Sequence, residues 1–279
     1  MPSALSLEGL HVVGSSEKAS APDSRRDAGL AIEVQNATLH YPLGPIGKKS
    51  IKLGLFRLFG AKDLSPQLAY VDAVRNLTFS IGAGERVAII GTNGSGKSTL
   101  LRALGGIYPL KEGKVRITGQ IGTLLDVQLG FEPEATGREN IYYRGMAMGY
   151  SRKQLREVEE EIVAFADIGR FIDLPVRTYS TGMYVRLGFA VSTQFQPDIL
   201  LIDEIFGAGD VGFAGRAIER MNRIVDRAGI LVLATHDVHL VQRLCSRVIW
   251  LSKGEIMRDG PPQVIIPQYL QYASGEVTH

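Results

Sequence analysis

Short, mainly apolar runs recur along the chain, and polar or turn-forming residues bound each of them. The clearest is 87–90, which follows a Gly-Ala-Gly turn at 82–84; similar runs occupy 198–202, 229–234 and 247–251. A strand that is apolar along its whole length is buried on both faces, as in parallel sheets covered by helices. The pattern therefore predicts an α/β fold built around a buried sheet.

Other segments add strands and helices to this sheet. Residues 31–41 and 77–81 have the composition of strands. Residues 151–168 have a strongly helical pattern, with Ser151 in the position of an N-cap, and a further helix pattern follows Lys97. We see no internal repeat in this order of elements.

Composition and length agree with a globular chain. With 279 residues, of which 45% are hydrophobic and 22% charged, the chain allows one large or two small domains and excludes wholesale disorder. Residues 1–29 are rich in Ser, Ala, Gly and charge, so we expect a disordered tail there. Only 19 residues follow Gly260, and we expect 261–279 to form a short C-terminal tail.

Charge, cysteine content and hydropathy exclude several classes of function. A net charge of +2 does not favour nucleic-acid binding, and the single cysteine, Cys245, rules out an internal disulfide. No stretch approaches the ~18 apolar residues that a bilayer-spanning helix needs. The N-terminus lacks a signal-peptide pattern, so we expect a cytosolic protein that can still dock on a membrane.

The strongest chemical signal is the segment 91–98, Gly-Thr-Asn-Gly-Ser-Gly-Lys-Ser, which matches the phosphate-binding pattern G-x-x-x-x-G-K-[ST]. Lys97 would reach the β- and γ-phosphates of a nucleotide, and the Ser98 hydroxyl would bind Mg²⁺. A glycine-rich turn could match by chance, but here a strand precedes the segment and a helix follows it, as the pattern requires. The nucleotide-binding residues predicted in this segment are Gly91, Asn93, Gly94, Ser95, Gly96, Lys97, Ser98 and Thr99.

Polar residues also follow two of the predicted strands. Asp203 and Glu204 end the strand at 198–202, where buried acids are costly unless a cation or water uses them. Asp203 would hold Mg²⁺ through its water shell, and Glu204 would orient or deprotonate an attacking water; alternatively, the pair only caps a following helix. His236, after 229–234, is either a structural histidine or a hydrogen-bond donor to a γ-phosphate.

The segment Tyr-Ser-Thr-Gly-Met at 179–183 separates these possibilities. It forms a turn that opens a helix, and it stands between a predicted helical insert and the acidic strand. In this order of motifs the chain resembles the ATPase subunit of an ABC transporter, over about residues 31–260. The family usually has Leu-Ser-Gly-Gly-Gln here, and the present variant is similar to the branch that exports O-antigen, capsule and teichoic-acid-type polysaccharides.

The resemblance implies a P-loop ABC ATPase core over residues 30–260, with an antiparallel β edge and a helical subdomain at about 128–195. It further implies a head-to-tail homodimer, in which Ser180, Thr181 and Gly182 of one subunit contact the ATP bound to the other.

Further positions take roles from the resemblance. His236 matches the switch histidine, and 207–210 matches the D-loop. Tyr41 stands where an aromatic ring stacks on adenine, although it precedes Gly91 by 50 residues and can also be an ordinary strand-end tyrosine. The usual Q-loop glutamine falls on Asp126, which would supply an oxygen to Mg²⁺, but nearby Gln128 is an equal alternative.

An insert at about 42–70 explains the long distance between Tyr41 and the phosphate-binding segment. Basic residues alternate there with apolar ones, which favours an amphipathic helix at a membrane interface or against a partner helix. The alternative is a solvated loop with some apolar packing.

The function that the resemblance implies is hydrolysis of ATP, with Mg²⁺, to power export of a lipid-linked cell-surface polysaccharide through a separate integral-membrane subunit. The protein would lie peripherally on the cytoplasmic face of the inner membrane, meet the glycolipid substrate only through the complex, and bind no nucleic acid. With few residues after Gly260, glycan selection would fall to the membrane subunit or to the channel entrance.

Three alternatives are weaker. ABC ATPases of DNA repair or translation need a long coiled coil or a second ATPase unit, and the chain has neither. A P-loop small-molecule kinase has no use for residues 179–183. An importer ATPase shares the ATP chemistry, and only the variant at 179–183 and the insert at 42–70 argue against it.

Overall fold

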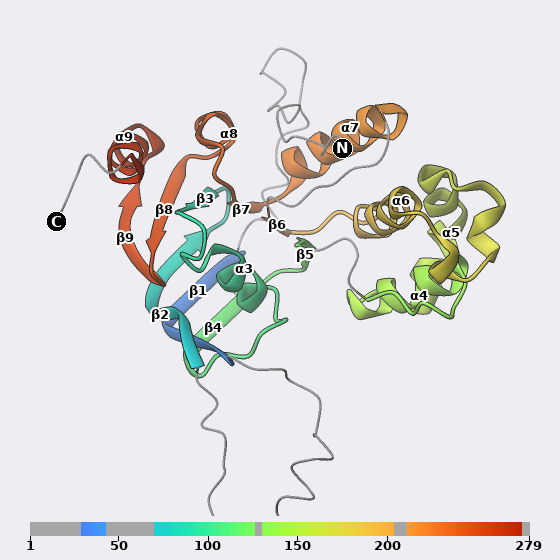
Figure 1. Ribbon diagram of the computed structural model, residues 1–279, viewed down its shortest axis with the longest axis horizontal. Coiled ribbons are helices and arrows are strands. Elements are labelled where there is room, and N and C mark those ends of the chain that lie inside the picture. The colour runs from blue at the N-terminus through green and yellow to red at the C-terminus, as the bar shows by residue number, and fades with distance from the viewer. Residues whose placement is uncertain (1–28, 43–69, 126–129, 204–210, 275–279) are drawn as a thin grey trace, which may run out of the picture.

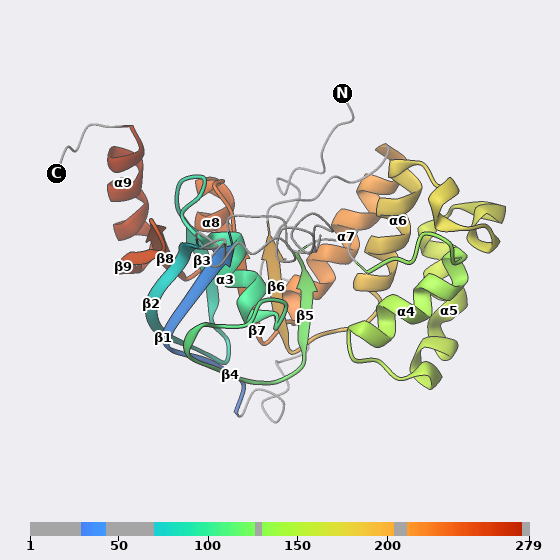
Figure 2. The ribbon, with the colours of Figure 1, turned by 60° about the horizontal axis from the view of Figure 1, so that its bottom comes forward.

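The structure is a computed structural model, and it describes residues 29–42, 70–125, 130–203 and 211–274. Two sheets lie together at one side of the molecule, and a lobe of helices lies at the other (Figures 1 and 2). The sheets and the helices that cover them position the candidate site, while the helical lobe carries a second group of predicted residues.

The larger sheet has six strands in the order β5-β6-β7-β3-β8-β9. Its members are β3 (Arg86–Ile90), β5 (Ile121–Leu124), β6 (Ile199–Asp203), β7 (Ile230–Ala234), β8 (Arg247–Ser252) and β9 (Glu255–Gly260). All neighbours pair in parallel except β9, which pairs antiparallel with β8. The four strands predicted from apolar runs, at 87–90, 198–202, 229–234 and 247–251, are confirmed as β3, β6, β7 and β8.

Both faces of this sheet are covered, which explains why its central strands are apolar throughout. Val87 and Ile89 of β3 belong to a core shared with α3 (Lys97–Leu104), whereas Ala88 and Ile90 face the opposite core. That second core is completed by the helices α7 (Val211–Arg227), α8 (Val238–Leu244) and α9 (Pro262–Ala273). Alternate residues of one strand thus bury apolar surface on two sides.

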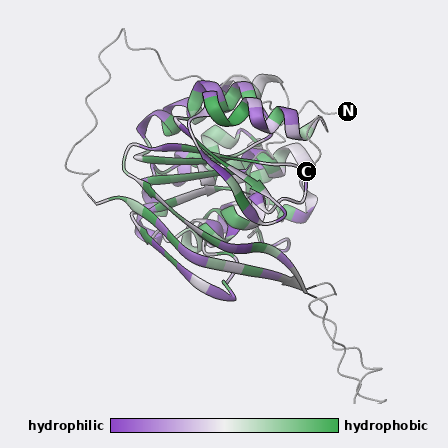
Figure 3. Ribbon diagram, turned by 90° about the vertical axis from the view of Figure 1, so that its left-hand side faces the viewer, coloured by the Kyte–Doolittle hydropathy of each residue, from purple (hydrophilic) through white to green (hydrophobic). Residues whose placement is uncertain are grey.

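The smaller sheet is antiparallel and has the order β2-β1-β4. It consists of β1 (Ala31–Pro42), β2 (Tyr70–Gly82) and β4 (Glu112–Thr118). Ile32 and Val34 of β1 are buried in the core with α3, while Gln35 is exposed. The resulting alternation of polar and apolar residues is visible along the long outer strands in Figure 3, and it is typical of sheets with one covered face.

The helical lobe contains α4 (Gly137–Ala147), α5 (Arg152–Ala166) and α6 (Thr181–Ser192), with the short 3₁₀-helices η2 (Gly169–Asp173) and η3 (Val176–Thr178) between α5 and α6. Ile141, Ile162 and Leu187, one from each α-helix, are fully buried in its core. Ser151 caps α5 by accepting a hydrogen bond from the backbone N–H of Gln154, as predicted. The lobe lies beside the β5–β6 end of the larger sheet (Figures 1 and 2).

The predicted α/β class, with a P-loop core, a group of helices and an antiparallel edge, matches this architecture. The division into 1–29, 30–260 and 261–279 stays a prediction, and α9 lies inside the third of these segments. Residues 1–28 and 43–69, and with them the predicted amphipathic helix, lie outside the described residues. Over the described ranges, no helix combines the length and apolar character that crossing a bilayer requires.

Candidate nucleotide-binding site

The loop between β3 and α3 carries the predicted phosphate-binding residues. Gly91 and Gly96 have φ angles of +153° and +105°, in the region that favours glycine. A Cβ on Gly91 would lie 2.3 Å from the carbonyl oxygen of Leu251, and a Cβ on Gly96 would lie 2.4 Å from that of Ala73. The loop is therefore pressed against β2 and β8, and glycine is required at both positions.

The loop ends at the N-terminus of α3, and this arrangement favours an anion. Gly96 occupies the N-cap position, so the described structure has no side chain that caps the helix, and its first turn has no acidic residue. The first backbone N–H groups of a helix need acceptors, and the helix dipole favours negative charge at this end. A phosphate group supplies both the acceptors and the charge.

Two side chains of the loop, Ser95 and Lys97, have polar groups beside its backbone. The Ser95 hydroxyl is buried, and within the described part of the chain it has no hydrogen-bond partner. Lys97 lies across the loop, where its ammonium group donates to the carbonyl oxygens of Gly91 at 2.7 Å and Thr92 at 3.1 Å. Lys97 supplies a positive charge that suits a phosphate chain, whereas the Ser95 hydroxyl lies against Gly91 and has no exposed surface.

The adjacent parallel strands β6, β7 and β3 end at the same edge of the sheet, where the loop follows β3. Further predicted residues lie at the ends of β6 and β7. Asp203 is the last residue of β6, is 3% exposed, and pairs with Ala234 of β7. Because β7 lies between β6 and β3, His236 follows it at the same edge of the sheet. The loop, Asp203 and His236 together line a pocket of about 460 Å³, whose lining residues are Asn93, Gly94, Ser95, Gly96, Lys97, Ser98, Thr99, Asp203 and His236.

These residues fit a nucleotide with Mg²⁺. The Ser98 hydroxyl and the Asp203 carboxylate supply oxygen, which is the ligand atom that Mg²⁺ prefers. The pocket also lies at the carboxyl ends of parallel strands, where α/β sheets usually bind ligands. Gly91 is not one of the lining residues and lies against the backbone of Leu251.

Other predicted residues do not line this pocket. Ser180, Thr181 and Gly182 lie at the N-terminus of α6 in the helical lobe, where the Ser180 hydroxyl accepts a hydrogen bond from the backbone N–H of Met183. Ser180 and Thr181 are exposed, and Gly182 is half-buried. The structure thus places two separate groups of predicted residues on one chain.

For several predicted positions the structure describes no side chain. Glu204, Asp126 and the alternative Gln128 lie outside the described residues, as does the predicted D-loop at 207–210. The backbone of Tyr41 pairs with Val71 near the end of β1, and its side chain is likewise outside the description.

Sequence reasoning missed the residues that shape the turn at His236. Thr235 is fully buried, and its hydroxyl accepts a hydrogen bond of 3.0 Å from the backbone N–H of Asp237. Asp237 in turn caps α8 by accepting from the N–H groups of His239 and Leu240. The signal was available, because Asp237 stands directly before a helical segment, which is the position of an N-cap.

Comparison with known families agrees with this geometry. A family model described as "ABC transporter" matches residues 74–207. The O-antigen export system ATP-binding protein RfbB of Klebsiella pneumoniae is 37% identical over 240 residues, which cover 86% of this chain and 97% of that protein. The chain belongs to the ABC transporter family of ATP-binding proteins.

Further relatives narrow this assignment. RfbB of Myxococcus xanthus, an O-antigen export ATP-binding protein, is 41% identical over 81% of this chain, which spans only 52% of that relative. The teichoic acids export ATP-binding protein TagH of Lactococcus lactis is 36% identical over 72% of this chain and 43% of its own length. The predicted resemblance to the polysaccharide-exporting branch is therefore confirmed.

Solved structures support the fold. A dimeric bacterial ABC transporter cassette has a TM-score of 0.57 at 24% identity and covers 83% of this chain and 98% of its own. An ATP-binding subunit of an ABC transporter has a TM-score of 0.60 at 22% identity, over 88% of this chain and 98% of its own. The predicted P-loop ABC ATPase fold is thereby confirmed.

Proposed function

We propose that this protein is the ATP-hydrolysing subunit that powers export of a lipid-linked cell-surface polysaccharide through a separate membrane subunit. One observation carries the proposal: the phosphate-binding loop, Asp203 and His236 converge on one pocket at the ends of parallel strands. The pocket supports the ATPase part, and the names of the relatives, O-antigen and teichoic acid export proteins, support the export part.

Different residues of the pocket bind the phosphates of ATP and the metal ion. Backbone N–H groups of the loop and the first turn of α3 hold the phosphates, and Lys97 balances the charge of the β- and γ-phosphates. Ser98 and Asp203 hold Mg²⁺, together with Asp126 or Gln128. When bound, the metal neutralises the charge that develops on the transferred phosphoryl group.

Hydrolysis then needs a water molecule in line with the γ-phosphate. Glu204 directly follows Asp203, so we assign it the role of orienting or deprotonating that water as ATP and water become ADP and phosphate. His236, in the pocket wall, contacts the γ-phosphate as a hydrogen-bond donor. Tyr41 is assigned to the adenine ring.

A second copy of the chain completes the site. Ser180, Thr181 and Gly182 begin α6 at a distance from their own pocket, and a helix N-terminus suits a phosphate. In a head-to-tail homodimer these residues contact the nucleotide held by the partner. The dimer works at the cytoplasmic face of the inner membrane, bound peripherally to the integral-membrane subunit that handles the glycolipid.

The ATPase part is tested with the full-length protein and two lysine variants. Lys97→Ala should abolish release of phosphate from ATP, because no other side chain of the loop supplies a cation to the phosphates. Lys153→Ala, at an exposed position of α5 in the helical lobe, is the matched control and should retain the wild-type rate. Full activity of Lys97→Ala would overturn the proposal, and the export part is tested by where glycan accumulates in cells.

A further inference from the structure

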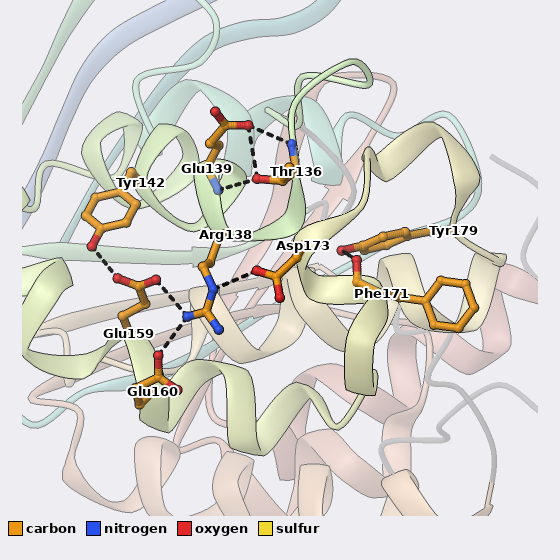
Figure 4. Close-up of polar contacts among 9 residues, drawn as sticks. All are labelled: Thr136, Arg138, Glu139, Tyr142, Glu159, Glu160, Phe171, Asp173 and Tyr179. Atoms are coloured by element: carbon orange, nitrogen blue, oxygen red, sulfur yellow. Dashed lines mark hydrogen bonds and ion pairs between the residues drawn. The ribbon is translucent and has the colours of Figure 1, made fainter.

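The turn that precedes α6 is anchored by a tyrosine. The Tyr179 hydroxyl donates a hydrogen bond of 2.7 Å to the carbonyl oxygen of Phe171 in η2 (Figure 4). The Tyr179 hydroxyl oxygen also lies against Gly137 at the start of α4, where a Cβ would come within 2.1 Å of it. Tyr179 therefore contacts both η2 and α4 in a space that only a glycine at 137 leaves open.

An ion-pair network fixes η2 to the rest of the lobe. Arg138 of α4 donates to Asp173 of η2 at 2.9 Å, and to Glu159 and Glu160 of α5 at 2.9 and 2.7 Å (Figure 4). These carboxylates raise the pKa of the Arg138 guanidinium above its ordinary value. Because one side chain joins α4, α5 and η2, the acceptor at Phe171 is held in a defined place.

Ser180 follows Tyr179 directly and caps α6. The position of the helix N-terminus therefore depends on how its preceding residue is held. We infer that Tyr179 is a positioning residue: its hydroxyl, bound to the Phe171 carbonyl, sets the placement of the Ser180–Gly182 turn toward the nucleotide of the partner subunit. This inference rests on the proposed function, because it assumes that the turn contacts a nucleotide bound to the partner subunit.

The Tyr179 hydroxyl can donate the hydrogen bond to the Phe171 carbonyl because it stays protonated. Burial, with the nearby Asp173 carboxylate, raises the pKa of Tyr179 to about 12. The group therefore remains a hydrogen-bond donor at physiological pH.

Two variants that each delete one hydroxyl from the lobe test the inference. Tyr179→Phe keeps the ring and removes the anchor. Tyr142→Phe is the matched control: its hydroxyl donates to Glu159, which keeps its bond to Arg138, and among the described residues it makes no hydrogen bond to η2 or to the turn. The full-length variants are compared for affinity toward a fluorescent ATP analogue, steady-state ATPase activity and melting temperature.

We expect Tyr179→Phe to lower kcat about three- to tenfold, the effect of one lost hydrogen bond, while nucleotide affinity stays within about twofold of wild type. The affinity is spared because the chain's own pocket is untouched. Tyr142→Phe should keep the wild-type kcat. Wild-type kcat in Tyr179→Phe, or an equal loss in both variants, would overturn the inference. Absence of ATPase activity in the wild type would instead overturn the proposed function.

Gly137→Ala supplies an independent test of the same contact. Its methyl group should displace the Tyr179 ring and lower kcat at least as much as Tyr179→Phe does. The double variant Gly137→Ala/Tyr179→Phe lacks the hydroxyl oxygen that the added methyl group would approach most closely. Its kcat should therefore equal that of Tyr179→Phe alone. Multiplied losses in the double variant would contradict the geometry, because they would place the two residues in separate roles.

Discussion

Gly96 offers the sharpest perturbation of the phosphate-binding loop. Its φ angle is +105°, and a Cβ there would lie 2.4 Å from the carbonyl oxygen of Ala73 in β2. That oxygen belongs to the backbone of a paired strand, so it cannot rotate away as a flexible side chain would. Gly96→Ala must therefore move the loop itself.

The size of the effect follows from two contributions. A left-handed backbone costs an L-residue roughly 1–2 kcal/mol. In addition, the loop must move by about 0.6 Å to reach 3.0 Å, below which Cβ contacts essentially never occur. Because displacements of about 1 Å can cost about a hundredfold in rate, strain and displacement together should lower kcat/KM for ATP about 100- to 500-fold.

Gly94→Ala is the control for the backbone contribution alone. Gly94 also has a positive φ, +79°, but no atom lies within 4 Å of the position that an added Cβ would take, so the variant carries strain without a collision. We expect its loss in kcat/KM to be about 5- to 30-fold, the equivalent of roughly 1–2 kcal/mol. The assay is steady-state ATPase activity of the full-length variants, with melting temperatures measured alongside. Equal losses of kcat/KM in Gly94→Ala and Gly96→Ala would refute this reasoning, because only the methyl group of Gly96→Ala collides with the Ala73 carbonyl oxygen.

Three further predictions concern turnover, packing and pH. Glu204→Gln should bind ATP with wild-type affinity but release no phosphate in a turnover assay, because water loses its base; preserved turnover would exclude this role. Phe213→Ala should lower the free energy of unfolding by about 3–5 kcal/mol in urea titrations, because the ring is fully buried; a loss below about 1 kcal/mol would contradict that packing. Burial raises the pKa of Cys245 to about 12 from an ordinary value of 9.0, so the unfolded thiol ionises first and stability should fall as pH rises from about 9 to 12. Cys245→Ala should flatten this part of the pH profile, and an unchanged slope would show that the thiol does not contribute.

The central strands and the phosphate-binding loop could be predicted because local signals there agree with the fold. A strand such as β3 is apolar on both faces, and the glycines after it are fixed by the close approach of neighbouring backbone. Asp203 and His236 could be proposed one at a time from their places at strand ends. Their convergence on one pocket follows from the strand order, which places β7 between β6 and β3.

Other elements depend on tertiary contacts that a sequence pattern does not contain. β4 has the sequence Glu-Gly-Lys-Val-Arg-Ile-Thr and is largely exposed, so its strand structure comes from pairing with β1. α9 contains Pro267 in its interior, which argues against a helix locally, but Ile265, Ile266 and Tyr269 are buried in the core. The proline thus obscured a helix that packing stabilises.

The contact of Tyr179 could not be predicted for a different reason. Sequence showed a tyrosine where the family usually has leucine, but not that its hydroxyl meets Phe171 beside Gly137. Those three residues are brought together by the packing of the lobe, and their separation in sequence carries no periodic signal.

The most direct test of the account is the location of the polysaccharide in cells that produce Lys97→Ala in place of the wild-type protein. We expect lipid-linked glycan to accumulate at the inner membrane, to be lost from the cell surface, and to return to the surface when wild-type protein is supplied. Normal surface glycan in cells whose purified variant has no ATPase activity would contradict export as the function, while leaving ATP hydrolysis in place.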